Sequence, residues 1–191
     1  VEEYDDPSLK EKIFAVGSSG MLCTSNYKAR KYGIRAGMPG FVGEALAKRL
    51  AKDKLVLVPP RHGGYKEFSL KAEEVFSQYD PNYAMMSLDE AYMDFTEHLE
   101  ARLSMTDEQK TFEGVLYGND IDSAVKEMRQ RVFLATGLTC SAGYGANTLV
   151  SKIASDMKKP NGQFAVAFDE ASVIEFLRRG CPLYVGSSLH N

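Results

Sequence analysis

The chain has 191 residues, of which 44% are hydrophobic and 26% are charged. This composition is that of an ordinary globular protein, and it excludes a disordered chain and a membrane protein built from apolar spans. With 26 acidic and 23 basic residues the formal net charge is -3, so a strongly basic module that wraps nucleic acid is also excluded.

The cysteines and the apolar stretches indicate the compartment. Cys23, Cys140 and Cys181 stand far apart, and their odd number without a Cys-x-x-Cys pair favours a reducing compartment and argues against a zinc site. Every apolar stretch is shorter than the roughly 18 residues of a membrane span, and residues 1–10 are acidic where a signal peptide is basic and then apolar. We therefore expect a protein that is neither secreted nor inserted in a membrane.

The first third of the chain alternates short apolar runs with turn residues. In chain order we expect the end of a helix at 8–12, strands at 13–16 and 21–24, helices at 26–33 and 41–52, and a buried strand at 55–58. Ser25 or Asn26 can cap the first of these helices, and Gly33 suits the position just past its end. The apolar face of the second helix would consist of Val42, Leu46, Ala47 and Leu50.

From Tyr65 the pattern is longer and more regular. Apolar residues at helical spacing from Phe68 to Tyr79 predict a helix that Asp80 and Pro81 end. We then expect strands at 83–88 and 91–95, a polar loop or insertion at 100–119, a helix at 121–136, a strand at 138–145, a helix at 147–156, a strand at 163–168 and a helix ending near 179.

This order predicts an α+β fold. Preceded by one more strand, it would be a ferredoxin-like β-α-β-β-α-β antiparallel sheet with helices on one face. We expect that first strand to be missing, because the chain starts in what reads as the middle of a helix. Many unrelated proteins share this sheet, so the layout alone does not indicate a function.

Asp89 and Glu90 are adjacent carboxylates at the junction of two predicted strands. Their repulsion is unfavourable unless a cation or solvent screens it, and Mg²⁺ is the natural cation because it binds through one or two carboxylates plus substrate phosphates. Two such ions would activate an attacking hydroxyl and neutralise a leaving pyrophosphate. For the pair alone, an exposed hairpin turn is the simpler explanation. The apolar residues on both sides of the pair make an exposed turn less favourable.

Thr24, Tyr27 and Arg30 are spaced by three residues at the start of a predicted short helix, so they can share one face. Together with backbone N–H groups they would form a cradle for a triphosphate, to which arginine makes bidentate contacts. Lys159 stands in a tight turn just beyond a predicted helix, where Pro160 restricts its backbone and helps to place its ammonium on a phosphate. Without further context, a surface helix and a solvated lysine explain these residues.

The remaining chemistry-bearing residues fit no motif. We assign Lys152 and Lys158 to a solvated helix face, and His62, His98 and His190 to surface positions, because no Ser or Cys accompanies the histidines in a catalytic motif. The sequence also has no G-x-x-x-x-G-K-[ST] phosphate loop.

Three segments together resemble the Y-family of translesion DNA polymerases, and within it most closely the kappa branch. The segments are TSNYKARKYGIRAGMPG, YDPNYAMMSLDEAYMDFTEHLE and LTCSAGYGANTLVSKIASDMKKPNGQ, which occur in the family's order and approximate spacing. The combination of S-L-D-E-A-Y at 87–92 with S-D-x-x-K-P-N-G at 155–162 is highly specific. The resemblance extends over most of residues 1–170.

The resemblance implies a domain organisation and a set of site residues. It implies a small α/β fingers domain over residues 1–61, a palm with the ferredoxin-like sheet over 62–175, and the truncated start of a thumb over 176–191. The catalytic metal ligands would be Asp89 and Glu90, and the intact enzyme would use two Mg²⁺ ions. The residues holding the triphosphate of the incoming nucleotide would be Thr24, Tyr27, Arg30 and Lys159.

The implied activity is template-directed DNA synthesis across damage, in which a deoxynucleotide is transferred to a primer 3′ hydroxyl. The implied partners are primer-template DNA and a deoxynucleoside triphosphate, with no membrane, and the implied location is the nucleus. Replication accessory proteins cannot be read from the sequence. Two alternatives stay open: a non-catalytic truncated isoform that binds nucleotide or partners, and a ferredoxin-like nucleotidyl cyclase that forms its product without a primer.

The sequence also departs from the family pattern. In the family a strand similar to D-M-D-A-F comes just before the V-E that opens this sequence. Without it, a third metal carboxylate and the aromatic gate against ribonucleotides are missing, which would cost orders of magnitude in rate. Residues 182–191 only begin to resemble the approach to the thumb, and residues 41–54 are a few residues longer than usual. We therefore expect this chain to be catalytically weak or dead alone.

Overall fold

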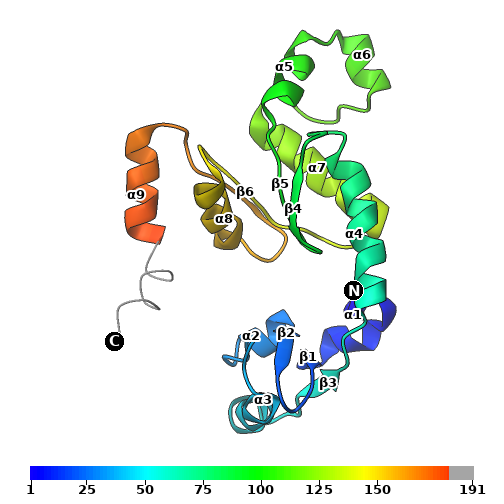
Figure 1. The fold of residues 1–191 in the computed structure, drawn as a ribbon, viewed down its shortest axis with the longest axis vertical. Coiled ribbons are helices and arrows are strands. Elements are labelled where there is room, and N and C mark those ends of the chain that lie inside the picture. The colour runs from blue at the N-terminus through cyan, green and yellow to red at the C-terminus, as the bar shows by residue number, and fades with distance from the viewer. Residues whose placement is uncertain (181–191) are drawn as a thin grey trace. The chain divides into compact units, whose positions relative to one another are not determined.

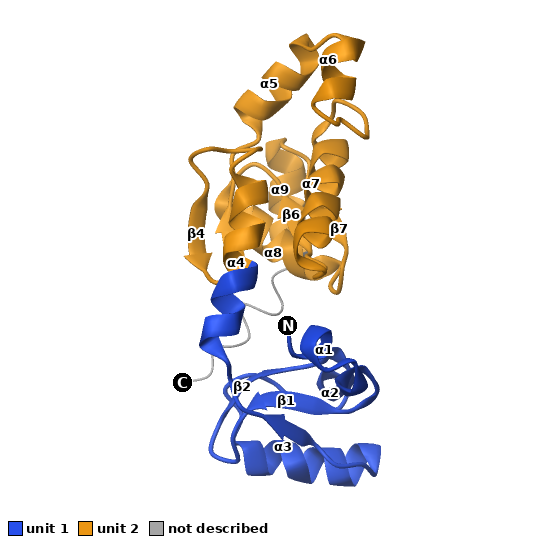
Figure 2. Ribbon diagram, turned by 90° about the vertical axis from the view of Figure 1, so that its right-hand side faces the viewer, with its two compact units in different colours: residues 1–68 blue, residues 69–191 orange. Residues whose placement is uncertain are grey.

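The computed structural model describes residues 1–180. They fall into two compact units, residues 1–68 and a second unit that starts at Ser69 (Figure 2). The boundary lies within helix α4, His62–Phe76, and each unit has its own hydrophobic core. Nowhere in residues 1–180 does a helix have the length and hydrophobicity that a bilayer crossing requires.

The first unit is a three-stranded sheet with short helices (Figure 1). Its elements are α1 (Glu2–Asp5), the 3₁₀ helix η1 (Pro7–Glu11), β1 (Phe14–Gly17), β2 (Leu22–Ser25), α2 (Tyr27–Arg30), α3 (Gly40–Leu46), the π-helical turn η2 (Ala47–Ala51) and β3 (Val56–Val58). The strand order is β2-β1-β3. β1 pairs antiparallel with β2 and parallel with β3, so β1 is the central strand.

Asn26 joins α2 to the central strand, as the predicted cap position requires. Its Oδ1 accepts hydrogen bonds from the backbone N–H of Ala29 at 3.0 Å and of Phe14 at 3.3 Å. Its Nδ2 donates to the carbonyl of Lys12 at 3.0 Å. Because a capping side chain satisfies N–H groups that a helix start leaves free, this residue fixes both the start of α2 and its position against β1.

The helix predicted over residues 41–52 is interrupted. It is formed by α3 and the π-helical turn η2, and the turn widens the helix after Leu46. Leu50 was expected on the apolar face but is 55% exposed. The reason is that a π-type turn breaks the regular spacing on which the predicted face depends.

The second unit contains the remainder of α4, four short strands and five further helices within its described residues. After α4 its elements are β4 (Ala84–Ser87), β5 (Glu90–Tyr92), α5 (Thr96–Ser104), α6 (Asp107–Phe112), α7 (Ile121–Thr136), β6 (Ala142–Tyr144), α8 (Thr148–Met157), β7 (Gln163–Ala165) and α9 (Glu170–Gly180). Asp120 is the N-cap of α7 and the left-handed Gly137 ends this helix, and Asn147 is the N-cap of α8.

The single antiparallel sheet expected for this unit is wrong for the described residues, where two separate two-stranded ladders form. β4 and β5 pair antiparallel, but β6 and β7 pair parallel. The parallel pairing follows from the connection: α8 carries the chain from β6 to β7, and such a crossover returns the second strand in the same direction. The α+β class is confirmed, whereas the continuous ferredoxin-like sheet is not.

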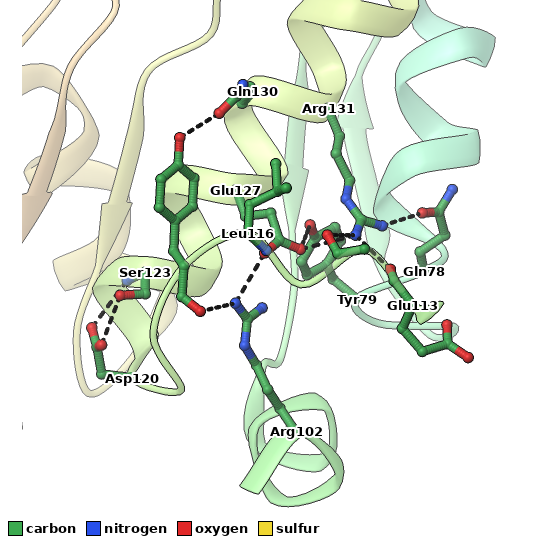
Figure 3. Close-up of polar contacts among 12 residues, drawn as sticks. Gln78, Tyr79, Arg102, Glu113, Leu116, Asp120, Ser123, Glu127, Gln130 and Arg131 are labelled. Carbon is green, nitrogen blue, oxygen red and sulfur yellow. Dashed lines mark hydrogen bonds and ion pairs between the residues drawn. The ribbon is translucent and has the colours of Figure 1, made fainter. Parts of the chain in front are cut away.

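The loop expected at residues 100–119 is wrong, because this segment contains most of α5 and all of α6. The apolar pattern did not reveal these helices, since α6 has no buried residue and the buried residue of α5 is Arg102. Arg102 extends to Glu127 on α7 (Figure 3). A buried ion pair with α7, rather than a stripe of apolar side chains, therefore holds this segment in place.

The surface position expected for His98 is also wrong. Its ring packs 4.6 Å from that of Tyr79 and 6.0 Å from that of Phe95, measured between ring centroids. Burial, followed by the nearby charge of Arg102, lowers the pKa of His98. His62 is exposed as expected, and His190 lies outside the described residues.

Candidate functional site

Asp89 and Glu90 lie at the turn between β4 and β5, and both are exposed. Asp89 belongs to the turn, where its Oδ1 accepts a hydrogen bond of 2.7 Å from the hydroxyl of Ser87. Glu90 is the first residue of β5 and stands opposite Ser87 in the ladder. The turn therefore presents two neighbouring carboxylates to solvent.

Lys152 on α8 donates to Oε1 of Glu90, so its assignment to a solvated face is wrong. The side chain of Lys152 is 32% exposed and that of Glu90 is 47% exposed. The hydrogen bond to Glu90 is the main cause that raises the pKa of Lys152. Lys158, by contrast, is exposed as expected.

Lys159 lies just beyond α8, where the sequence predicts it. Its Nζ is 2.6 Å from Oδ1 of Asp156, three residues earlier in the chain. The turn that follows contains a cis peptide bond to Pro160 and a left-handed backbone at Asn161, with φ 50°. The ammonium is thus paired with a carboxylate, and the Lys159 side chain is 36% exposed.

The three nucleotide-binding residues expected in the first unit do not share a helix. Thr24 is exposed and belongs to β2, whereas Tyr27 and Arg30 are the first and last residues of α2. The guanidinium of Arg30 lies 4.8 Å from the ring centre of Tyr27 and its Nε donates to the carbonyl of Ser25 at 3.0 Å. No acidic side chain in residues 1–180 forms an ion pair with Arg30, so its charge is available for an anion.

Helix α8 is held firmly, which fixes the position of the Lys152 backbone. The side chain of Asn147 accepts from the backbone N–H of Val150 at 2.9 Å, and Val150 is fully buried. At Gly143 on β6 a Cβ atom would lie only 2.1 Å from the backbone nitrogen of Ser155. A side chain larger than hydrogen is therefore incompatible with the close approach of β6 to α8.

The donor set of the β4–β5 turn fits Mg²⁺. This ion prefers oxygen ligands and commonly binds through one or two carboxylates while it retains water and substrate phosphates. Asp89 and Glu90 supply carboxylate oxygens at an exposed position. Residues 1–180 contain no group of three or more His, Cys, Asp or Glu side chains arranged to hold a metal.

A shallow groove of about 620 Å³ lies elsewhere in the second unit, between β7 and α9. Its lining is mainly apolar and includes Phe164, Val166 and Phe176. None of the predicted site residues lines it. The candidate site is therefore an exposed charged surface and not this groove.

The sequence interpretation missed Lys152 and Asp156. Together with Lys159 they form the pattern K-x-x-x-D-x-x-K, in which charges of opposite sign recur at helical spacing. That spacing could have placed Lys152 and Asp156 on one side of α8, with Lys159 just beyond its end. The contact of Lys152 with Glu90 joins residues 62 positions apart, and no local pattern indicates it.

The model of the impB/mucB/samB family matches residues 1–156. A DNA polymerase kappa of Arabidopsis thaliana is 43% identical over 177 residues, which cover 93% of this chain and 23% of the relative. A DNA polymerase kappa of Mus musculus is 32% identical over 238 residues, covering 93% and 27% respectively. A DNA polymerase IV of Escherichia coli O139:H28 (strain E24377A / ETEC) is 37% identical over 182 residues, covering 93% and 45%.

Solved structures agree with these relatives. DinB from Sulfolobus solfataricus superposes with a TM-score of 0.71 at 28% identity, covering 92% of this chain and 46% of that one. A Dbh ternary complex gives the same TM-score, identity and coverage. The chain thus spans less than half the length of each of these relatives and structures. It belongs to the impB/mucB/samB family, which is the Y-family of DNA polymerases.

Proposed function

We propose that this chain carries the nucleotide-binding and metal-binding part of a translesion DNA polymerase. The reaction is the transfer of a deoxynucleotide to a primer 3′ hydroxyl on a DNA template with two divalent ions. The family match over residues 1–156, together with the exposed Asp89 and Glu90 at the β4–β5 turn, carries the proposal. In it the fingers domain is residues 1–61, the palm is 62–175 and the thumb begins at 176, with residues 181–191 outside the described range.

Each site residue has a role that its chemistry supports. Asp89 and Glu90 hold Mg²⁺, which when bound neutralises developing charge and lowers the pKa of an attacking hydroxyl. Arg30 and Lys159 contact the phosphates, the guanidinium through planar contacts and the ammonium as a point charge.

Two further groups complete the proposed nucleotide contacts. The hydroxyls of Thr24 and Tyr27 each donate one hydrogen bond to a phosphate oxygen. Both residues are exposed, and the ring of Tyr27 also stacks on the guanidinium of Arg30. Tyr27 therefore orients Arg30 as well as contacting the phosphate.

The partners in this proposal are primer-template DNA and a deoxynucleoside triphosphate. Two of the structural neighbours are ternary complexes of Dbh, one of them an insertion complex, which supports simultaneous binding of both. A nuclear location belongs to the same proposal, because the relatives named DNA polymerase kappa come from eukaryotes, whose chromosomal DNA lies in the nucleus.

Calorimetric titration of the chain with a deoxynucleoside triphosphate tests the proposal. We expect binding in Mg²⁺ that weakens about tenfold or more in Asp89→Asn, since even outer-shell changes at metal sites cost that much. Asp107→Asn on the exposed helix α6 removes the same charge and should leave binding unchanged. Binding that is equal in Mg²⁺ and in EDTA, and equal in Asp89→Asn, would contradict the proposal.

Product analysis separates the alternative functions. Extension of a labelled primer only in the presence of a complementary template supports the polymerase. A cyclic nucleotide and pyrophosphate formed without primer would instead identify a cyclase. Magnesium-dependent nucleotide binding without any turnover would support a binding role for this chain alone.

A further inference from the structure

Four charged side chains of the second unit alternate in sign from β5 along α8. Glu90 is paired with Lys152, and Asp156 is paired with Lys159. Lys152 and Asp156 are four residues apart on α8, so they are neighbours on the helix surface. The proposed metal carboxylate and the proposed phosphate-binding ammonium are thus each held by an oppositely charged residue of the same helix.

The four charged side chains can exchange ion-pair partners without a movement of α8. When the Glu90 carboxylate binds a divalent cation, the cation replaces the Lys152 ammonium as its positively charged partner. Lys152 already interacts electrostatically with Asp156 and can pair with it across one helical turn. The ion pair between Asp156 and Lys159 then breaks, and the Lys159 ammonium becomes available to an anion.

We propose that Lys152 and Asp156 are positioning residues that couple cation binding at Glu90 to phosphate binding at Lys159. Without ligands they neutralise the site. When the cation binds, Lys152 moves from Glu90 to Asp156 and Lys159 is released. This inference rests on the proposed function, because it takes Glu90 as a metal ligand and Lys159 as a phosphate ligand.

The position of α8 makes this coupling specific to Lys152. The helix cannot shift easily, because Gly143 of β6 lies against its backbone and Ala154 on its inner face is fully buried. Lys158 has the same charge, but its Nζ lies 5.8 Å from the ring centre of Phe164. The exchange therefore needs only side-chain rotation of Lys152, and Lys158 provides a charge-matched control.

Binding of Mn²⁺ alone, followed by electron paramagnetic resonance of the free ion, tests the first half. Lys152→Met removes the competitor for Glu90, so we expect binding about fivefold tighter, the size of a weak coupling or a good exposed ion pair. Lys152→Arg keeps the charge and should bind like the unaltered chain, and Lys158→Met should change the affinity by less than Lys152→Met does. Circular dichroism checks that each variant is folded.

Binding of inorganic tripolyphosphate in excess EDTA tests the second half without metal. Asp156→Asn frees Lys159, so we expect binding roughly threefold tighter, as for loss of an exposed ion pair. The gain should vanish in Asp156→Asn combined with Lys159→Met, which a double-mutant cycle isolates. Glu108→Gln on α6 is the control for the change in net charge.

The outcomes separate this inference from the proposed function. Mn²⁺ binding that depends on Asp89 and Glu90 but is unchanged or weakened in Lys152→Met overturns the inference and leaves the proposed function standing. Tripolyphosphate binding that is equal with and without Asp156 also overturns it. If the unaltered chain binds no Mn²⁺ at all, the proposed metal site itself is wrong.

Discussion

Arg102 on α5 donates to the carboxylate of Glu127 on α7 over 2.9 Å, and both side chains are only 1% exposed. Glu127 accepts further hydrogen bonds from the hydroxyl of Tyr79 at 3.0 Å and from the backbone N–H of Leu116 at 2.9 Å (Figure 3). Arg131, one turn along α7, forms a second ion pair with it at 3.0 Å. A single carboxylate thus joins three separate segments of the second unit.

Arg102→Ala should destabilise the region around α5 by about 3 kcal/mol or more, because removal of one partner leaves the other charge buried and poorly compensated. We expect hydrogen exchange of the α5 amides to accelerate, while the amides of α8 keep their protection. Arg102→Met retains much of the side-chain packing and shows how much of the loss is electrostatic. Unchanged exchange in Arg102→Ala would mean that the pair does not hold α5.

The Glu127 carboxylate also makes the stability of the fold depend on pH in the acidic range. Burial alone would raise the pKa of Glu127, but hydrogen bonds from Leu116, Tyr79 and Arg102 outweigh burial and lower its pKa. Its stabilising effect is complete above the ordinary glutamate pKa of about 4.3 and is lost as the pH falls through the lower pKa of the folded state. Asp122, whose pKa is lowered mainly by a hydrogen bond from Tyr144, acts in the same direction.

Urea denaturation as a function of pH measures this effect. We expect a nearly constant midpoint from these two groups above pH ~5 and a steep fall below pH ~4. Glu127→Gln should lower the midpoint at neutral pH and flatten its acid dependence. A pH profile of Glu127→Gln parallel to that of the unaltered chain would assign the acid sensitivity to other carboxylates.

Gly143→Ala should destabilise the second unit by about 1–3 kcal/mol through overpacking. The added Cβ would meet the backbone of Ser155 at 2.1 Å and of Ser151 at 2.3 Å, and neither can rotate away. Gly63→Ala is the matched control: it lies within α4, where an added Cβ meets nothing within 4 Å, and should stabilise by about 0.5–1 kcal/mol. Thermal denaturation followed by circular dichroism compares the two.

Asn147→Ala should cost about 1 kcal/mol, because it removes the side chain that caps α8. Asn147→Asp keeps an acceptor at the same place and should retain most of the stability. Hydrogen exchange at Val150, whose N–H the cap binds, reports the change locally. Equal exchange in both variants would show that the cap contributes little in solution.

Local features of the fold could be predicted from the sequence. Asn26, Asp120 and Asn147 cap their helices because an Asn or Asp side chain bonds to backbone only three residues ahead. Gly137 ends α7 with φ 71°, which a residue without Cβ adopts readily. Such interactions depend on neighbours in the chain and need no tertiary structure.

Nonlocal polar contacts could not be predicted in the same way. Arg102 and Glu127 are charged residues 25 positions apart, and only their contact in the folded chain makes burial of both favourable. The same is true of Glu90 and Lys152. The candidate site residues could be named from motifs, but the partners that hold them come from elements placed beside them by folding.

The weak packing of α6 against the rest of the second unit has a practical consequence. None of its residues is buried, and Phe112 is 89% exposed, while the buried ion pair of Arg102 holds the chain before it. An affinity tag or a fluorophore inserted between α5 and α6 would therefore leave the core intact. Immobilised there, the molecule would keep Glu90 and Lys159 accessible to reagents in solution.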